Sequence, residues 1–263
     1  MQKVAVVTGA SSGIGLAIAK ELIQNDYIVY SFSRSAPKEE KIKHIVCDVS
    51  KRESLVSAFK AVYDNEKHID AVINNAGMGI SGPLEYEPEQ DINKIMSVNL
   101  LGTINSCAVC LPYIRETKGR IINIGSIAGE FGIPFQTLYS VTKAGVMALS
   151  MALQNEVRPL GVKITCLMPG DIKTNFTANR EKTCDEVDAI YGNRVQNSIK
   201  KMEKDEQNGM PPEAIAVAIR KVLAKKNPPM CLTVGFSYKT LRSLKRIFPT
   251  KLINKILYSM YGK

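Results

Sequence analysis

The sequence has few histidines and no long apolar run. Its 263 residues include two histidines, His44 and His68, and neither belongs to a cluster of His and carboxylate residues that would indicate a metal site. No apolar run approaches the ~18 residues that span a bilayer. The first strand-like run begins at Lys3, which leaves no room for a signal peptide. We therefore expect a cytoplasmic protein without a bound metal.

The chain also lacks the cysteine pattern of a disulfide framework or a zinc site. Thiols in a chain without an export signal are expected to be reduced and to fill the core. They are scattered along the sequence, at Cys47, Cys107, Cys110, Cys166, Cys184 and Cys231. Cys107 and Cys110 form a CxxC, but it lies in an apolar helical stretch without a partner pair. We therefore predict neither zinc nor redox chemistry there.

No acidic residue follows Glu213, and this absence localises the charge of the protein. The net charge is +10, and eleven Lys and Arg residues lie after position 213. The remaining 24 basic residues against 25 acidic ones leave residues 1–213 nearly neutral, at −1. Net charge is the only feature that favours a nucleic-acid partner, so we expect none.

Basic residues at the chain end alternate with apolar residues at helical spacing, with an interruption at Pro249. The apolar positions are Leu241, Leu244, Ile247, Leu252, Ile253, Ile256, Leu257 and Met260. We predict a basic amphipathic helical tail over residues 236–263. Such a tail either lies on an anionic membrane surface or packs on its own subunit or a dimer partner, with the basic face in solvent.

Short apolar runs alternate with amphipathic helical segments along most of the chain. Strands are predicted at 3–8, 27–33, 45–48, 70–74, 120–124, 162–168 and 231–234, and helices at 14–23, 52–64, 91–115, 139–158 and 211–226. Strands separated by helices form right-handed crossovers and a parallel sheet covered on both faces. The sequence predicts one α/β domain over residues 1–263, doubly wound, with a charged substrate lid at 175–210 and a small C-terminal helical extension.

Tyr139 and Lys143 are four residues apart, so on a helix they lie on one face. A Lys ammonium beside a phenol stabilises the phenolate and lowers the phenol pKa from about 10, so that the phenol exchanges a proton with a carbonyl oxygen. Ser126 follows a buried-strand pattern, and its hydroxyl would bond the same oxygen. Taken alone, the spacing also fits a solvated amphipathic turn. A Gly-x-Ser-x-Gly elbow is absent around Ser126, which argues against a Ser-His-Asp hydrolase.

A glycine-rich turn joins the first predicted strand to the first predicted helix. It reads Gly9-Ala-Ser-Ser-Gly13-Ile-Gly15, and such glycines let backbone N–H groups and the helix N-terminus approach a pyrophosphate. The alternative is a turn without a ligand. The spacing is Gly-x-x-x-Gly-x-Gly, which departs from the Gly-x-Gly-x-x-Gly of most dinucleotide-binding folds.

Several motifs in register resemble those of the short-chain dehydrogenase/reductase family over positions 1–174. They are Thr8-Gly-Ala-Ser-Ser-Gly-Ile-Gly15, Asn74-Asn-Ala-Gly77, Asn99, Ser126, Tyr139-x-x-x-Lys143 and Pro169-Gly170. The resemblance implies a Rossmann fold and hydride transfer between a nicotinamide and a carbonyl or secondary alcohol.

The same resemblance implies a catalytic role for four residues. Tyr139 would be the general acid/base, and Lys143 would lower its pKa and bond the nicotinamide ribose. Ser126 would hold the substrate oxygen. Asn99 would complete a proton relay by holding a water near Lys143, or it would instead kink its helix or bond the backbone.

Cofactor-binding residues are also implied by the resemblance. They are Gly9, Ser11, Ser12, Gly13, Ile14, Gly15, Ser33, Arg34, Asp48, Val49, Asn75, Ala76, Gly77, Tyr139, Lys143, Pro169, Gly170, Ile172 and Thr174. Ser33 and Arg34 stand where an acidic residue would favour NAD, and Arg34 would clamp a 2′-phosphate. We predict NADP(H), with NAD(H) as the alternative, although Ser12 replaces the basic residue of many NADP-specific members. Asp48 would meet the adenine ring, cap the helix that follows, or do both.

Loops beyond the strand ends carry apolar side chains that would wall a substrate. They are Met78, Ile80, Phe131, Ile133, Pro134, Phe135 and Phe176, and part of this set also fits a core role. We predict a lipophilic substrate: a hydroxysteroid or bile acid, a retinoid or a fatty acyl compound. The tail resembles those of hydroxysteroid and retinol dehydrogenase-like members, and the family implies a homodimer or homotetramer. Two other classes stay open: a catalytically silent nicotinamide-binding regulator, and a membrane-associated interaction protein that uses the tail.

Overall fold

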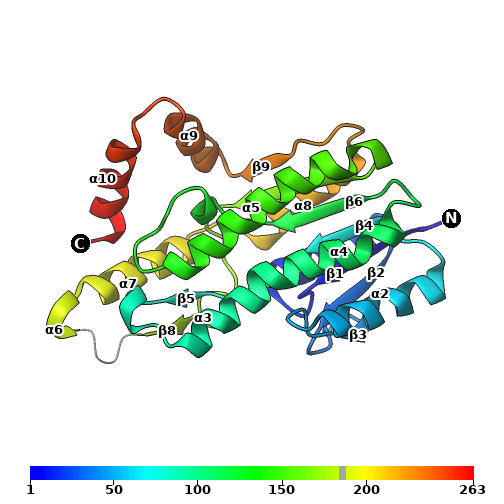
Figure 1. Ribbon diagram of the computed structural model, residues 1–263, viewed down its shortest axis with the longest axis horizontal. Coiled ribbons are helices and arrows are strands. Elements are labelled where there is room, and N and C mark those ends of the chain that lie inside the picture. The colour runs from blue at the N-terminus through cyan, green and yellow to red at the C-terminus, as the bar shows by residue number, and fades with distance from the viewer. Residues whose placement is uncertain (184–187) are drawn as a thin grey trace.

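Seven parallel strands form the central sheet of the protein, whose computed structural model describes residues 1–183 and 188–263 (Figure 1). The strand order is β3-β2-β1-β4-β6-β7-β9, and every neighbouring pair is parallel. The predicted doubly wound α/β fold is thereby confirmed. The strands are β1 Lys3–Thr8, β2 Tyr27–Ser33, β3 Lys43–Val46, β4 Ala71–Asn74, β6 Arg120–Ile124, β7 Lys163–Pro169 and β9 Cys231–Val234.

Helices cover both faces of this sheet, with α1 and α8 packed together on one face and α2, α4 and α5 on the other. In β1, Val4 and Val6 join the core of the α2–α4 face, whereas Ala5 and Val7 join the core of the α1–α8 face. This alternation buries the strand on both sides. The helices are α1 Gly13–Ile23, α2 Arg52–Glu66, α4 Gly102–Ile114, α5 Thr137–Val157 and α8 Pro212–Ala224.

Buried polar side chains fix the helices of one face to the sheet. Asn74 and Asn123 are opposite in the register of β4 and β6, and their side chains bond at 2.8 Å. Ser106 of α4 donates to Asn74 at 2.6 Å, and Asn123 donates to Ser150 of α5 at 2.9 Å. The four side chains satisfy one another in a dry environment, which sets the position of α5 relative to the strand ends.

The helix predicted at 91–115 is longer than expected and irregular. α3 (Glu89–Ile95) continues through a π-helical segment, Met96–Leu101, into α4, so that one helix runs from Glu89 to Ile114. By length and apolar composition alone it would cross a membrane, which differs from the sequence-based expectation. In this fold it packs against β4, β6, α2 and α5. Its π-helical segment carries Asn99.

Short elements at the carboxyl edge of the sheet were not predicted. β5 (Ile80–Ser81) pairs in parallel with β8 (Glu181–Lys182), and strands of two residues carry no periodicity. The expected helical lid contains α6 (Asp188–Tyr191) and α7 (Arg194–Gln207) after this strand. β3 begins and ends two residues earlier than predicted, and Cys184 lies outside the described residues. Three 3-10 turns complete the chain, at Leu84–Tyr86, Ile127–Gly129 and Arg158–Leu160.

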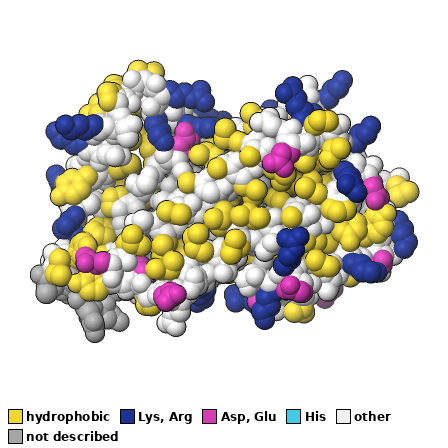
Figure 2. Space-filling model, in the orientation of Figure 1, with side chains coloured by type: hydrophobic (Ala, Val, Ile, Leu, Met, Phe, Trp, Pro, Cys, Tyr) yellow, Lys and Arg dark blue, Asp and Glu magenta, His cyan; other side chains and the backbone are white. Residues whose placement is uncertain are grey.

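After β9 the chain forms α9 (Phe236–Lys245) and α10 (Thr250–Tyr261), with Pro249 between them as predicted. α10 contacts α7, and its Ile253 and Leu257 pack against Phe131. Figure 2 shows hydrophobic side chains next to Lys and Arg side chains over these two helices. The exposed apolar side chains are Phe236, Leu244, Ile247, Phe248, Leu252, Ile256, Tyr258 and Met260.

Candidate active site

The turn after β1 is fixed against the end of β4. Thr8 Oγ1 accepts hydrogen bonds from the backbone amides of Asn75 and Ala76, each at 2.9 Å. The Asn75 side chain donates to the Thr8 carbonyl oxygen at 3.0 Å. Gly9 then turns with a φ of +69°, and a Cβ there would lie 3.0 Å from the Ala76 Cα. These contacts bring together the glycine turn and the 75–77 segment, and Thr8 is a site residue that was not predicted.

α1 begins directly behind this turn. Gly13 has a φ of +55°, and a Cβ at Gly15 would lie 2.3 Å from the Gly9 carbonyl oxygen. Within the described part of the chain, the Ser12 side chain makes no capping hydrogen bond to the first amides of the helix. An uncapped helix N-terminus behind a turn of small residues fits the pyrophosphate of a nicotinamide dinucleotide. Two further residues predicted to bind cofactor lie here, Ser11 in the turn and Ile14 in the first turn of α1.

The segment after β7 lies on the other side of the turn. A Cβ at Gly13 would be 3.6 Å from the Thr174 Cβ, so these two predicted cofactor residues are neighbours. Ile172 is buried in the core that α1 covers. Tyr238 of α9 lies on Gly170, because a Cβ there would be 2.1 Å from its ring. The described structure therefore brings residues 170–174 to the predicted pyrophosphate site.

Ser33 and Arg34 lie at the end of β2, where the adenosine ribose of a dinucleotide would sit. Ser33 is buried, and its hydroxyl donates to a nearby backbone carbonyl at 2.8 Å. Arg34 is exposed. Burial favours a higher pKa for Asp48, but hydrogen bonds from Ser50 and the positive charges of Lys51 and Arg34 outweigh it, so the Asp48 pKa is lowered. Arg34 is thus an exposed positive charge near the ionised carboxylate of Asp48.

Asp48 does not cap the helix that follows, contrary to one of its two predicted roles. The N-cap position of α2 is Lys51, and the Asp48 carboxylate instead accepts from the Ser50 amide at 3.0 Å and hydroxyl at 2.7 Å. Beside it, a hollow is lined by Thr8, Val49, Asn74, Ala76, Val98, Gly102 and Thr103. Two residues predicted on the adenosine side therefore share one concave surface.

Tyr139 lies in the first turn of α5, and Lys143 follows one turn later on the same face. The Lys143 ammonium lies 5.7 Å from the centroid of the Tyr139 ring and donates to the Ile124 carbonyl oxygen at 2.8 Å. Ser126, just beyond β6, caps a 3-10 turn by accepting from the Ala128 amide at 3.1 Å. The predicted trio therefore comes from two places: Ser126 from the carboxyl end of β6, and Tyr139 and Lys143 from the first turns of α5.

Burial dominates the protonation of this trio. It raises the pKa of Tyr139 to about 12, with Ser126 and Arg180 opposing the rise and Glu206 and Asp171 adding to it. Burial lowers the pKa of Lys143 to about 8. The predicted lowering of the Tyr139 pKa by Lys143 is not found, because the phenol is enclosed and the ammonium is bonded to a backbone carbonyl.

Asn99 lies at the centre of the π-helical segment, with its side chain fully buried. It accepts from the Met78 amide at 2.8 Å and donates to the Met78 carbonyl oxygen at 2.9 Å. The predicted alternative, a side-chain bond to backbone in an irregular helix, is thus present. A Cβ at Gly77 would lie 3.4 Å from Asn99 Oδ1 and 3.7 Å from Lys143 Nζ, so the three residues are close together. The relay role of Asn99 stays a prediction.

The lid brings two charged residues to the site that were not predicted. The Phe176 and Tyr139 ring centroids are 5.8 Å apart, and the Arg180 guanidinium lies 5.9 Å from the Phe176 ring. Arg180 forms an ion pair with Glu206 of α7. The sequence carries no local signal for this pair, because the two residues are 26 positions apart in a highly charged segment.

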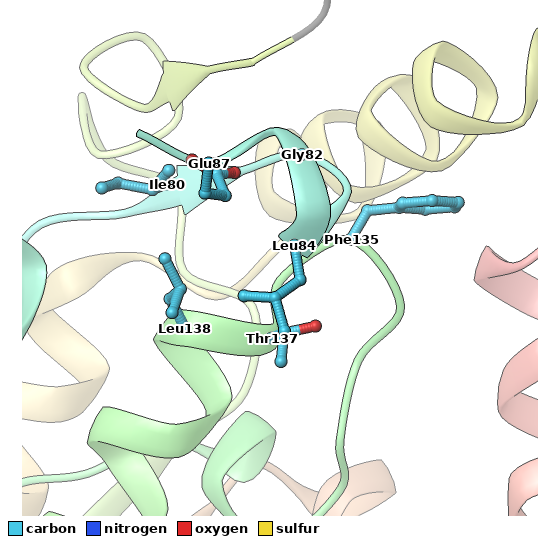
Figure 3. A pocket seen from close by; sticks show the side chains of 7 residues that line it. All are labelled: Ile80, Gly82, Leu84, Glu87, Phe135, Thr137 and Leu138. Atoms are coloured by element: carbon cyan, nitrogen blue, oxygen red, sulfur yellow. The ribbon is translucent and has the colours of Figure 1, made fainter. Parts of the chain in front are cut away.

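Three of the seven residues predicted to wall a substrate are buried: Ile80, Phe131 and Phe135. Phe131 packs under α10, and Phe135 packs with Val195, Ile199 and Met202 of α7. Figure 3 shows a second hollow beside the first turn of α5, and Tyr139 is not among the residues that line it. Its lining residues are Ile80, Gly82, Leu84, Glu87, Phe135, Thr137 and Leu138. The hollow therefore lies next to Tyr139 along α5, and Phe176 is the apolar residue whose ring contacts the Tyr139 ring.

The histidines set aside on sequence grounds contact backbone carbonyls. The His44 ring is 2.9 Å from the carbonyl oxygen of Ser33, a predicted cofactor residue, and the His68 ring contacts the carbonyl oxygens of Glu66 and Gln2. Cys107 and Cys110 are buried, and burial raises the pKa of Cys107 to about 12, which fits core thiols. In residues 1–183 and 188–263 no group of three His, Cys, Asp or Glu side chains is arranged to hold a metal ion.

Comparison with known proteins gives relatives of similar length. The chain is 41% identical over 239 residues to a 3-ketodihydrosphingosine reductase of Bacteroides thetaiotaomicron, covering 89% of this chain and 88% of the relative. It is 30% identical over 269 residues to the NADPH-dependent 1-acyldihydroxyacetone phosphate reductase of Saccharomyces cerevisiae, covering 97% of this chain and 89% of the relative.

Solved structures show the same fold. A short-chain dehydrogenase from Streptomyces avermitilis superposes with a TM-score of 0.81 at 26% identity and covers 94% of both chains. An alcohol dehydrogenase from Thermococcus sibiricus, complexed with 5-hydroxy-NADP, superposes with a TM-score of 0.74 at 28% identity, covering 89% of this chain and 96% of that one. The short chain dehydrogenase family profile matches residues 3–185. The chain therefore belongs to the short-chain dehydrogenase/reductase family and is an NAD(P)-dependent oxidoreductase acting on CH–OH groups.

Proposed function

We propose that the protein reduces the ketone of a long-chain lipid, of the 3-ketodihydrosphingosine kind, with NADPH as the hydride donor. The observation that carries the proposal is the contact between the Tyr139 and Phe176 rings, which sets an apolar surface directly beside the proton donor. Among the predicted lipid classes, the names of the bacterial and yeast relatives favour the acyl class over steroids and retinoids.

When bound, the nicotinamide supplies the hydride, and the chain manages one proton. With a pKa of about 12, Tyr139 keeps its proton at neutral pH and gives it to the carbonyl oxygen as the alcohol forms. Ser126 donates a hydrogen bond to the same oxygen. Lys143, with a pKa of about 8, exchanges its proton with solvent in the physiological range and restores the phenol through a water held by Asn99. In the oxidative direction Tyr139 is the general base.

NADP(H) preference rests on the end of β2. Arg34 is exposed there and sits close enough to Asp48 to lower its pKa, so its charge is available to an adenosine 2′-phosphate. Ser33 contributes no carboxylate that would repel this phosphate or hold a 2′-hydroxyl in its place.

The proposal is tested with purified protein and a matched panel of carbonyl compounds. NADPH and NADH oxidation are measured with 3-ketodihydrosphingosine, a steroid ketone, retinal and a ketose. We expect the sphingoid ketone with NADPH to give the highest kcat/KM. Faster turnover of the steroid or of retinal would reassign the substrate class. Cofactor binding without turnover of any ketone would favour the silent regulator.

A second role, association of the tail with an anionic membrane, is favoured by the outer surface of α10. Leu252, Ile256 and Met260 are four residues apart, so they form one exposed apolar stripe, with Lys251 and Lys255 exposed beside it. Because α10 contacts α7 of the lid, binding of the tail to a membrane would place the lid next to the lipids of that membrane. The membrane contact would be peripheral, on a protein that we propose to be cytoplasmic, with one domain that includes the lid and the tail.

Vesicle cosedimentation tests this role with the full chain. We expect binding to phosphatidylserine-containing vesicles to exceed binding to phosphatidylcholine vesicles, and Ile256→Asp to abolish the difference. Val56→Asp, at an exposed apolar position of α2, is the matched control. If Ile256→Asp changes the oligomeric mass and not vesicle binding, the stripe is instead a contact between subunits.

We also infer a homo-oligomer, a dimer or a tetramer. Leu101 of the helix Glu89–Ile114 and Val141 and Met151 of α5 are exposed apolar side chains. Light scattering after size exclusion should give two or four times the chain mass, and Met151→Glu should lower it. A monomeric wild-type protein would contradict the inference.

A further inference from the structure

Arg180 is a buried cation with hydrogen-bond donors to spare. Its side chain has 0% of its surface exposed, and one terminal nitrogen, Nη2, pairs with Glu206. Within residues 1–183 and 188–263, neither its Nε nor its Nη1 has a hydrogen-bond partner. Buried donors without an acceptor destabilise a fold, and a guanidinium cannot lose its charge to escape the penalty. A hydrogen-bond acceptor from outside the described residues would therefore stabilise these two nitrogens.

The backbone holds Arg180 firmly in place beside the glycine segment that follows β4. The next residue, Glu181, donates its amide to the Gly79 carbonyl oxygen at 3.1 Å, and Thr183 donates to Ser81 at 3.0 Å. These bonds belong to the pairing of β8 with β5. Arg180 directly precedes this short strand, which gives its backbone a defined position.

Arg180 lies one side chain away from the reacting group. A Cβ at Gly79 would be 2.9 Å from the Phe176 ring and 3.6 Å from Arg180 Nε, so Arg180 and Phe176 meet at this glycine. The guanidinium lies 5.9 Å from the Phe176 ring, whose other neighbour is the Tyr139 ring at 5.8 Å. The Arg180 charge is also felt at the Tyr139 phenol, where it opposes the rise in pKa. The Phe176 ring therefore lies between the Tyr139 phenol and the two Arg180 nitrogens that lack a partner.

We propose that Arg180 Nε and Nη1 bind a second oxygen of the substrate, a hydroxyl close to the ketone that is reduced at Tyr139. The ion pair with Glu206 balances the Arg180 charge, so a neutral oxygen suits the site better than a phosphate. Thr177 donates to the other Glu206 carboxylate oxygen at 2.5 Å, which holds Glu206 in position. The inference rests on the proposed function, and it adds that the lipid ketone carries a polar group near the reacting carbon.

A second ion pair close by provides a matched control. Lys182 of β8 pairs with Glu203 of α7 at 2.6 Å, and its side chain is 42% exposed. Both pairs join the segment at residues 180–182 to α7, but Arg180 is buried and Lys182 is exposed. If Arg180 served only to tie β8 to α7, loss of either pair would affect ligands in the same way.

The test measures ketone binding to the complex of the enzyme with NADP⁺, in which a ketone cannot react. Calorimetric titrations compare 1-hydroxydecan-3-one with decan-3-one for wild type, Arg180→Met, Arg180→Lys and Lys182→Met. We expect wild type to bind the hydroxyketone about ten- to hundredfold more tightly, the range of a hydrogen bond to a charged group. Arg180→Met should remove this preference, Arg180→Lys should keep part of it, and Lys182→Met should keep all of it.

Three results would overturn the inference. The first is equal binding of the two ketones by wild type, and the second is an undiminished preference in both Arg180 variants. The third is a loss of NADP⁺ affinity in Arg180→Met that accounts for the loss of ketone binding. NADPH oxidation with the same ketones is recorded separately. Hydroxyketone binding that depends on Arg180 without turnover would refute the proposed reductase activity and leave the binding site standing.

Discussion

The Lys143 ammonium donates to the Ile124 carbonyl oxygen, 2.8 Å away, at a position closed to solvent. Burial lowers its pKa to about 8 from an ordinary value of 10.5. Below pH 8 the buried ammonium is charged, and its loss of hydration lowers the free energy of unfolding. Above pH 8 the folded state releases this proton while the unfolded state still holds it, so the free energy of unfolding increases with pH.

We predict that Lys143→Met changes the pH dependence of stability. Wild type should gain about 2 kcal/mol relative to Lys143→Met between pH 8 and pH 9.5, from the shift of its pKa. Urea unfolding of the cofactor-free proteins at both pH values measures the difference. Parallel stability curves for the two proteins would show that the buried ammonium does not titrate in this range.

Tyr139→Phe should reduce turnover by about 10²–10⁴-fold, because the general acid is lost. The substitution leaves the glycine turn and its contacts with Asn75 and Ala76 in place, so NADPH affinity should change little. Tyr191→Phe is the matched control, since Tyr191 bonds Glu85 at 2.5 Å on the protein exterior. Steady-state kinetics and NADPH fluorescence titration give the two quantities. Substantial ketone reduction by Tyr139→Phe would assign the proton to another group.

Arg34→Ala should weaken NADPH binding by about ten- to hundredfold and leave NADH binding unchanged, because only NADPH carries the 2′-phosphate. Ser33→Asp added to this variant should shift preference to NADH. Ser33 is buried and hydrogen-bonded, so the single Arg34 variant is the cleaner measurement. Equal losses for both cofactors would mean that Arg34 acts on the fold rather than on the phosphate.

Gly170→Ala should destabilise the protein by about 1–3 kcal/mol, because the new methyl group would overlap the Tyr238 ring. Combining it with Tyr238→Ala should recover part of this loss, which is the coupling that a double-mutant cycle detects. Denaturant unfolding of the four proteins provides the cycle. Strictly additive losses would show that α9 does not depend on the contact with Gly170.

Elements with strong local patterns were predicted from the sequence, and the site elements that depend on distant contacts were not. β9 was predicted with its observed bounds, because Cys231–Val234 is an apolar run closed by Gly235. The α5 helix and its Tyr139–Lys143 face were predicted from spacing together with the other motifs of the family. The π-helical turn at Asn99 was not, since it reflects packing against Met78.

The charges around the site were the least predictable. Arg180 and Glu206 lie in a segment rich in Lys, Arg, Asp and Glu, where most charges are solvated, and burial of this pair depends on where α7 docks. The Tyr139 pKa was predicted to fall, since spacing places Lys143 nearby. It rises because enclosure by the lid outweighs nearby charge, and enclosure is a property of the assembled fold.

The packing of α10 on Phe131 ties the loop after Ser126 to a helix far along the chain. The glycine turn instead has its partners nearby in the sheet, because Thr8 and Gly9 contact Asn75 and Ala76. The two parts of the site therefore depend on different parts of the chain, and a substitution that detaches α10 would disturb the loop after Ser126 while the glycine turn keeps its contacts.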